Sequence, residues 1–470
     1  MASEQWSSRL GFLLATVGAA VGLGNIWRFS AVVGANGGGA YLVPYLLAAF
    51  VCAVPLLVLE LAVGRSLRTD VVSAFRSVGP AYTALGWLVV GGVLLVLSYY
   101  LVLTGWVLGF LLSWLAGTEP TFAGFTDGWL PVAYFVVATA LTGGVVSLGV
   151  RGGIERMASV VMPTVFAVLV ALAVYAVTLS GWDRATSFLF TPEFGVLSDP
   201  AVWSAAFGQV FFSLSVGQGI MLTFGSYVDE ATDLRRSALL ITVADIGAAV
   251  VAGLVIFPVV FSFGLEPTLG TELAFTTLPT AFASMSFGRV VAVAFFGLLF
   301  FAALSSGVAL LEVGVAAAET TTRLDRPRAT AALTGGVFLL GVPSALSYSP
   351  LDLAVTGRPV LDVVDESVGT FALPVSAVLI VAVFLWATDL GDVRRDLGPL
   401  YPLAKYLAPA VLVAATGSKA VGVARPAWRL LVDGGRTAPS AVLVAIAALL
   451  AVGVLGWLVR PRLPSPRRRR

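Results

Sequence analysis

Long apolar stretches alternate with short polar loops along almost the whole chain. A helix needs about 20 apolar residues to cross the hydrocarbon core of a bilayer, so each stretch is a candidate membrane span. We predict twelve spans, which begin near residues 10, 40, 84, 131, 157, 201, 237, 288, 329, 368, 404 and 439. Lys419 interrupts the eleventh. The pattern predicts an all-α polytopic membrane protein.

The composition agrees with this fold class and removes several kinds of function. Hydrophobic residues make up 58% of the chain and charged residues 11%, whereas soluble proteins have about 25% charged residues. We therefore expect one transmembrane domain over residues 1–470. The chain has no histidine and one cysteine, Cys52, so it offers neither a disulfide framework nor a nucleophile–base set. We do not expect an enzyme.

The positions of the basic residues predict how the chain lies in the membrane, because cytoplasmic loops are rich in Arg and Lys. With the N-terminus inside, only eight of the 28 basic residues face outward. The inner ones include Arg65, Arg68, Arg76, Arg151, Arg156, Arg235, Arg236, Arg323, Arg326, Arg328, Arg394, Arg395 and the tail Arg467–Arg470. We interpret the tail as a topology anchor on anionic lipid and expect no nucleic acid partner. Both termini are thus predicted to be cytoplasmic, in a cell membrane.

Two spans contain sequences that are poor for a membrane helix. The first contains "GAAVGLGNIWRF" (Gly18–Phe29), and each interior glycine costs about 1 kcal/mol of helix propensity. The sixth contains "FFSLSVGQG" (Phe211–Gly219), where a lipid-facing helix would have Leu or Ile. Paired interruptions in two halves of a chain indicate a transporter binding site. The alternative is a glycine-rich face for helix packing.

A break in the first span would expose two kinds of backbone group in the membrane. Gly22 lies about 20 Å into a hydrocarbon core of about 30 Å, counted from Arg9. Free carbonyls on the inner half-helix suit a hard cation. Free N–H groups at the start of the outer half-helix suit a carboxylate. One break can therefore hold a cation and a carboxylate together.

Four stretches of the sequence resemble the neurotransmitter:sodium symporter family. The longest, "RLGFLLATVGAAVGLGNIWRFSAVVGANGGGAYLVPY" (Arg9–Tyr45), is similar to that family's first two helices. The others are Phe211–Gly219, "FAALSSGVAL" (Phe301–Leu310) and "RGGIERMASVVMP" (Arg151–Pro163). The similarity covers spans 1 to 10, and the last two spans carry no such motif.

The resemblance implies two inverted five-helix repeats with discontinuous helices 1 and 6, the LeuT-like fold of prokaryotic members. The repeats would cover residues 9–180 and 200–390, followed by spans 11 and 12 with the basic tail in 391–470. It also implies two sodium sites. The first would use Ala20, Asn25, Ser213 and Asp245, and the second Gly18, Val21, Ala302, Ser305 and Ser306. The adjacent serines could instead bond back to their own helix.

Asp245 departs from the family, which usually has Asn at this position. A carboxylate within a span is costly and is a functional candidate by default. Three residues of the family's chloride site are present, Tyr45, Gln209 and Ser213, but its second serine is Ala249 here. We hypothesise that Asp245 supplies the negative charge and that chloride is not needed. The alternative is a proton-sharing structural Asp.

The resemblance also places a substrate site between the two breaks. Backbone N–H groups of Leu23 and Gly24 and the Tyr100 hydroxyl would hold a carboxylate. Amine-selective members have an Asp where this chain has Gly22, so an amino acid is favoured over a monoamine. The ammonium would meet carbonyls of Ala20, Phe212 and Ser213 with the Ser215 hydroxyl, and the side chain would meet Val96, Phe212, Gln218, Ser306 and Leu310.

The residues of the two gates differ in how well they match the family. Outside, Arg28 and Asp365 match the ion-pair positions, although Arg28 could instead be an interfacial side chain. Inside, the family's Arg–Asp pair is replaced by Ser3 and Thr320. We expect other charges to act there, for example Glu4 with Arg9. Glu60 and Glu312 are further membrane carboxylates, which we assign to the inner hydrogen-bond network.

Taken together, these patterns predict a sodium-coupled symporter of a neutral, hydrophobic or aromatic amino acid. It would work by alternating access without chloride. Its partners would be sodium, the amino acid and the lipid bilayer. One alternative is a proton-coupled carrier of the same fold that uses Asp245 or Glu60. Another is a non-transporting membrane sensor, which would not need both broken helices.

Overall fold

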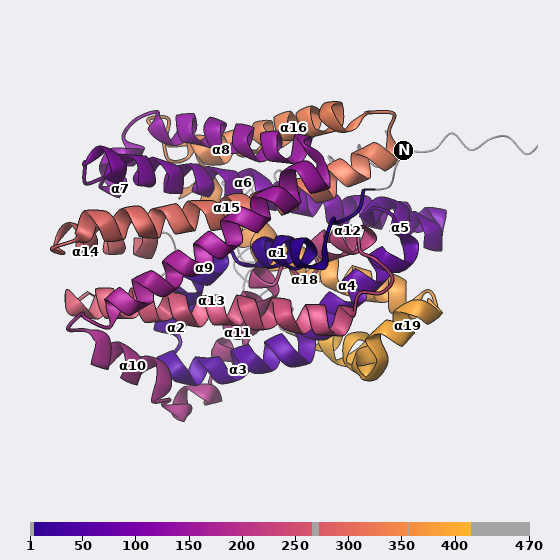
Figure 1. Cartoon of the computed structure of the whole chain (residues 1–470), viewed down its shortest axis with the longest axis horizontal. Helices are drawn as coiled ribbons and strands as arrows, with labels where there is room; N and C mark the ends of the chain where they lie inside the picture. The colour runs from indigo at the N-terminus through magenta and orange to yellow at the C-terminus, as the bar shows by residue number, and fades with distance from the viewer. Residues whose placement is uncertain (1–3, 266–271, 356, 415–470) are drawn as a thin grey trace, which may run out of the picture.

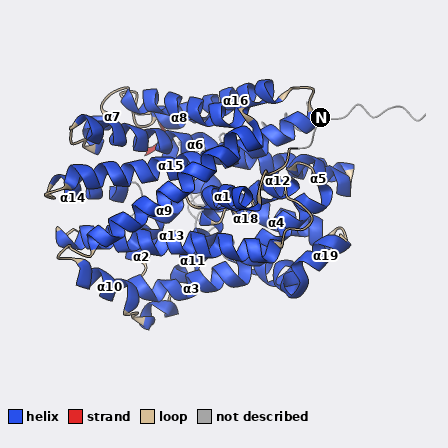
Figure 2. Cartoon of the chain, in the orientation of Figure 1, coloured by secondary structure: helices blue, strands red, loops and turns tan. Residues whose placement is uncertain are grey.

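The protein is a bundle of helices in a computed structural model that describes residues 4–265, 272–355 and 357–414. Figure 2 shows that most of the described chain is helical. The described strands are a two-residue pair, β1 (Ala354–Val355) and β2 (Arg358–Pro359), in which Ala354 faces Pro359. The all-α prediction is confirmed.

Eight continuous helical stretches of the described residues are long and apolar enough to cross a membrane. Some combine regular α-helix with short 3-10 or π-helical segments, which are labelled η. In chain order they contain η2 (Gly38–Tyr41), α3 (Leu42–Leu47), η3 (Ala48–Ala53) and α4 (Val54–Leu67); η4 (Pro80–Tyr82) and α6 (Thr83–Ala116); α8 (Leu130–Ser147); η5 (Val150–Glu155) and α9 (Arg156–Ala176). They continue with α13 (Leu234–Ser262); α15 (Gly288–Thr321); α16 (Arg326–Leu346); and α17 (Val360–Val364), η8 (Asp365–Ala372), α18 (Leu373–Val381) and η9 (Ala382–Trp386).

Two further predicted spans are broken. The first consists of α1 (Arg9–Ala20), η1 (Gly24–Arg28) and α2 (Phe29–Ala35), with a bend of 54° after α1. The sixth consists of α11 (Pro200–Ser213) and α12 (Ile220–Ser226). The described part of the predicted eleventh span begins at η11 (Leu403–Leu407), and a bend of 94° separates it from the preceding α19 (Gly391–Leu397) and η10 (Gly398–Leu400). The predicted twelfth span lies outside the described residues.

Short helices lie within the segments that connect the spans. They are α5 (Val71–Val78), α7 (Phe122–Thr126), α10 (Trp182–Phe190), η6 (Phe194–Ser198), η7 (Leu273–Thr277) and α14 (Leu278–Ala283). The last two form one short apolar helix, Leu273–Ala283, in the loop before α15. Phe275 of η7 packs edge-on against Trp106 of α6, with ring centroids 5.6 Å apart, so this loop covers the end of a central helix.

The broken first span lies inside the bundle rather than at its surface. Figure 1 shows α1 near the middle of the molecule, and α1 contacts α9, α13 and α15. Small residues permit this close approach: a Cβ added to Gly11 or Gly18 would overlap a side chain of α15 or of the η5–α9 helix. The break in the span is therefore surrounded by protein, which is the condition for non-helical backbone at membrane depth.

Candidate functional site

The two helix breaks are adjacent in space and differ in their backbone. The first is short: α1 ends at Ala20, and Val21 is already extended, with φ −76° and ψ 103°. The second spans six residues, and Ser215, Gly217 and Gly219 have φ values of 55°, 83° and 69°. Glycine adopts this left-handed region without the cost that a Cβ imposes. The Ser215 hydroxyl donates to the carbonyl of Ala19 at 3.2 Å, which joins the breaks.

The predicted first sodium site forms a buried polar cluster. The amide nitrogen of Asn25 donates to Oδ1 of Asp245 at 2.6 Å and to the Ser213 hydroxyl at 2.8 Å. The Ser213 hydroxyl in turn lies 2.9 and 3.0 Å from the two Asp245 carboxylate oxygens. Asn25 and Asp245 are fully buried. The structure therefore brings together three side chains from η1, α11 and α13, beside a cavity that Ala20 lines.

Residues of the predicted second sodium site also meet, between α1 and α15. The Ser306 hydroxyl lies 3.3 Å from the carbonyl of Gly18 and 3.3 Å from that of Ala302. A Cβ on Gly18 would stand only 2.3 Å from the Ser305 hydroxyl. The alternative interpretation was that the serines bond back to their own helix. Ser306 does so, because its hydroxyl donates to the Ala302 carbonyl. The Ser305 hydroxyl makes no hydrogen bond within the described part of the chain, so its oxygen is available to a cation.

A cavity opens between the two breaks, and its lining matches the substrate prediction closely. The residues that line it are Ala19, Ala20, Gly22, Gly24, Val96, Tyr100, Phe212, Ser213, Ser215, Gln218, Ser306 and Leu310. Leu23 is the one predicted residue outside this set, and its N–H donates to the Tyr100 hydroxyl at 3.4 Å. Ala19 was not predicted, because nothing in the sequence distinguishes it from Ala20.

Gly22 has a steric reason to be glycine. A Cβ there would lie 2.5 Å from the Ser306 hydroxyl and 2.8 Å from the Tyr100 hydroxyl. Real Cβ atoms do not approach other atoms so closely. The absence of a side chain thus keeps free the space between the first break, α6 and α15.

The three residues that match the family's chloride site lie on two packed helices, Tyr45 on α3 and Gln209 with Ser213 on α11. The Gln209 amide nitrogen donates to the carbonyl of Gly24 at 2.7 Å. The other amide atom of Gln209 and the Tyr45 hydroxyl are buried without a hydrogen-bond partner among the described residues. Ala249, at the second serine position, is fully buried on the same helix as Asp245.

The outer gate residues lie on a second cavity that adjoins the first. Arg28 and Asp365 both line it, together with Tyr99 and Phe212. The guanidinium carbon of Arg28 stands 4.2 Å from the centre of the Phe212 ring, a cation–π contact. The described residues contain no direct ion pair between Arg28 and Asp365.

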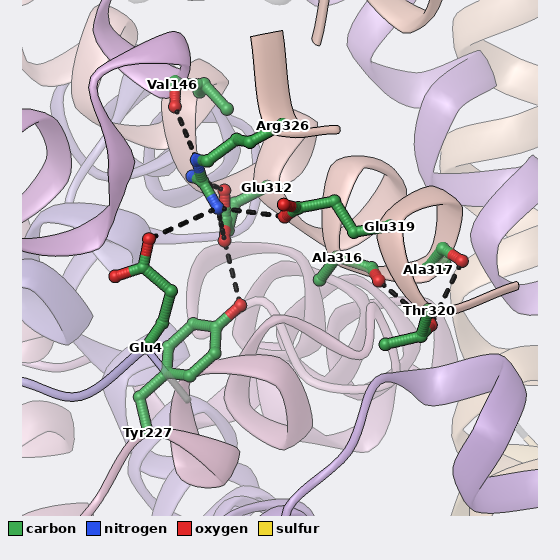
Figure 3. Close-up of polar contacts among 9 residues, drawn as sticks. All are labelled: Glu4, Val146, Tyr227, Glu312, Ala316, Ala317, Glu319, Thr320 and Arg326. Carbon is green, nitrogen blue, oxygen red and sulfur yellow. Dashed lines mark hydrogen bonds and ion pairs between the residues drawn. The ribbon is translucent and has the colours of Figure 1, made fainter. Parts of the chain in front are cut away.

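At the end of the bundle that the sequence predicts to face inward, Arg326 is the centre of the charge network, as Figure 3 shows. Its guanidinium lies 2.6 Å from the buried Glu312 carboxylate, 3.2 Å from Glu319 and 4.0 Å from Glu4. The expectation that Glu4 pairs with Arg9 is wrong, because Arg326 at the start of α16 reaches it instead. The assignment of Glu312 to the inner network holds, and Tyr227 donates to it at 2.8 Å.

Two other inner residues have partners that the sequence did not indicate. Thr320, which replaces the family's Asp, donates its hydroxyl to the Asp70 carboxylate at the start of α5. Ser3 lies outside the described residues. Glu60 does not belong to the inner network, because it accepts the N–H of Gly217, in the second break, at 2.7 Å.

Comparison with known proteins identifies the family to which the chain belongs. The model of the sodium:neurotransmitter symporter family matches residues 3–122 and 128–401. The sodium-dependent transporter YhdH of Bacillus subtilis is 37% identical over 391 residues, which is 80% of this chain and 86% of that protein. A sodium-dependent transporter of Methanocaldococcus jannaschii is 32% identical over 84% of each chain.

Among solved structures, that of MhsT in complex with L-phenylalanine matches with a TM-score of 0.81 and 37% sequence identity. The match covers 88% of this chain and 98% of MhsT, so the protein has the LeuT fold of that transporter. Its relatives are transporters rather than enzymes. The chain is therefore a multi-pass, sodium-coupled membrane transporter that belongs to the sodium:neurotransmitter symporter family.

Proposed function

We propose that the protein carries a neutral α-amino acid across the plasma membrane together with sodium, by alternating access, with both termini in the cytoplasm. The observation that carries this proposal is the cavity between the two helix breaks, which has no charged side chain in its lining. A zwitterion has equal and opposite charges, so uncharged polar groups are enough to hold it. The N–H groups of Leu23 and Gly24 with the Tyr100 hydroxyl suit its carboxylate.

The opposite side of the cavity suits the ammonium and the substrate side chain. Carbonyls of Ala20, Phe212 and Ser213 would accept from the ammonium. Val96 and Leu310 make the rest apolar, and Gln218 adds a buried amide to the cavity wall. Because the related MhsT was solved with L-phenylalanine, we infer a hydrophobic or aromatic side chain, with Gln218 contacting its far end.

Two sodium ions would support this transport. The site around Asn25 and Asp245 would bind its ion with the help of the substrate carboxylate, so each ligand would raise the affinity of the other. The site at Gly18 and Ser305 would bind its ion with neutral oxygens alone. Neutral oxygens hold a monovalent cation reversibly, which a transport cycle requires.

Chloride would not be needed. The Asp245 carboxylate lies within hydrogen-bond distance of Ser213, where a bound anion would otherwise balance the sodium charge. A fixed negative charge at this place makes a second anion electrostatically unfavourable.

A second candidate function is proton-coupled transport of the same substrates, favoured by the full burial of Asp245. Proteoliposome uptake of labelled amino acids separates the two functions. We expect uptake that requires an inward sodium gradient and persists when gluconate replaces chloride. Uptake that followed a proton gradient without sodium would support the second candidate instead.

A further inference from the structure

The residues that precede α1 lie across the inner ends of several helices. This N-terminal segment, Glu4–Ser8, contacts α12 through Trp6, whose indole N–H donates to the carbonyl of Phe224 at 3.1 Å. Its Gln5 carbonyl accepts from the Arg151 guanidinium of η5 at 2.7 Å. The segment therefore covers the inner ends of α1, α12 and η5 while it remains bound.

A buried carboxylate on η5 makes the strongest contacts with this segment. Glu155 is 5% exposed. Its carboxylate accepts the backbone N–H of Ser7 at 2.8 Å, the Ser7 hydroxyl at 2.6 Å and the Ser8 hydroxyl at 3.2 Å. Within the described chain, every hydrogen bond of this carboxylate comes from those two residues. Removing the segment would leave a buried charge without partners.

Glu155 also begins the contact surface between α1 and α9. A Cβ on Gly11 would stand 1.8 Å from a Glu155 oxygen, and one on Gly18 would stand 3.0 Å from the sulfur of Met162. Glu155, Ala158 and Met162 are spaced three and four residues apart and so share one helix face. This face runs from the N-terminal segment to Gly18, a residue of the proposed second sodium site.

We propose that Glu155 is a positioning residue that keeps the inner side closed. Its carboxylate holds the N-terminal segment through three charge-assisted hydrogen bonds. When they break, α1 is free to separate from α9, and water reaches the second sodium site along the Ala158 face. This inference adds a residue to the transport cycle and does not depend on which amino acid is carried.

Few other charged contacts hold the N-terminal segment at the inner end of this chain. The Arg–Asp pair that holds the N-terminus in the family is absent by sequence, because Ser3 and Thr320 occupy its positions. Thr320 bonds to Asp70 of the neighbouring loop rather than to the N-terminal segment. Arg326 is 4.0 Å from Glu4, a long contact to a partly exposed side chain. Glu155 supplies shorter and better buried bonds.

The test uses the accessibility of a single thiol. In a Cys52→Ala, Ala158→Cys protein in detergent, a charged methanethiosulfonate reagent labels the thiol only when α1 and α9 separate. We expect Glu155→Gln to raise the sodium-free labelling rate about tenfold or more, because three bonds to a charged acceptor each weaken about fivefold when that acceptor becomes a neutral amide. The matched control is Glu230→Gln, which removes an exposed carboxylate of an inner loop whose ion pair is with Arg68 and not with the segment or with Arg326. Its rate should stay within about twofold.

A milder variant protects the test against misfolding. Ser7→Ala removes the closest hydroxyl donor and no buried charge, so it should raise the labelling rate at an unchanged unfolding temperature. Ser8 is kept, because its hydroxyl also accepts the N–H of Gly11 and caps α1. Combined with Glu155→Gln it should add little further, because the residues act as one interaction. Labelling within twofold of the parent for both Glu155→Gln and Ser7→Ala would overturn the proposal.

Discussion

Asp245 is the residue whose replacement tests the ion chemistry most directly. Two donors, the Asn25 amide and the Ser213 hydroxyl, bond to its carboxylate at 2.6 to 3.0 Å. In Asp245→Asn the charge is lost while the size is kept. The sodium ion then loses the attraction of a carboxylate, which is about 4 kcal/mol for unit charges about 4 Å apart at an effective dielectric constant of about 20. A neutral side chain costs less to bury, which offsets part of this loss, and we take about 2 kcal/mol as the net change. The sodium concentration for half-maximal uptake should rise about 30-fold.

The same change should create a requirement for chloride. Without the carboxylate, the sodium charge is left unbalanced in a buried site, and an external anion becomes favourable there. Chloride should therefore restore most of the lost sodium affinity, most completely in Asp245→Asn with Ala249→Ser, which supplies the missing serine.

The assay is proteoliposome uptake against sodium concentration, in chloride and in gluconate. The parent protein should behave alike in both salts, and Asp245→Asn should depend on chloride. The reasoning is refuted if the parent loses uptake in gluconate, or if Asp245→Asn keeps parental sodium affinity in both salts.

Three further changes test other parts of the site. Ser305→Ala should reduce equilibrium binding of radioactive sodium about tenfold in affinity while Asp245 is intact; an unchanged affinity would remove Ser305 from the second site. Gly22→Ala should abolish substrate binding by scintillation proximity, since its Cβ would be 2.5 Å from the Ser306 hydroxyl; parental binding would contradict this steric requirement for glycine. Gly217→Ala should lower the thermal unfolding temperature, because φ is 83° and a Cβ would lie 2.7 Å from the Leu373 carbonyl. Its control is Gly247→Ala, whose Cβ would meet no atom within 4 Å. Equal unfolding temperatures of the two variants would count against backbone strain at Gly217.

Hydropathy alone was enough to place most helices, because a membrane span must satisfy its backbone within itself and so needs about 20 apolar residues. The breaks were also visible, since Gly18, Gly22 and Gly217 are poor helix formers in an otherwise apolar context. The cavity lining followed from the family resemblance. Leu23 is the exception, because it does not line the cavity and instead donates its N–H to the Tyr100 hydroxyl. These features are local in sequence, which is why they could be predicted.

Contacts between distant charges could not be predicted in this way. Charge and position suggested Glu4 with Arg9, whereas Arg326, far along the chain, reaches Glu4 and Glu312. Glu60 was placed at the inner end by its position in the second span, but it contacts Gly217 in the second break. The role of Glu155 could not be predicted from the sequence, because a single carboxylate in a basic inner loop is expected to be exposed to water. Its burial depends on the N-terminal segment that covers it.

The sequence by itself determined the class of protein, the membrane spans, the two helix breaks and the residue types available for ions and a zwitterion. Those depend on composition and on spacing along one helix. The tertiary structure decided which oxygens and charges meet: Asn25 with Asp245, Arg326 with Glu4, and Glu155 with Ser7. Such pairs are set by how the helices pack around α1, and a buried carboxylate takes whichever donor that packing brings within about 3 Å.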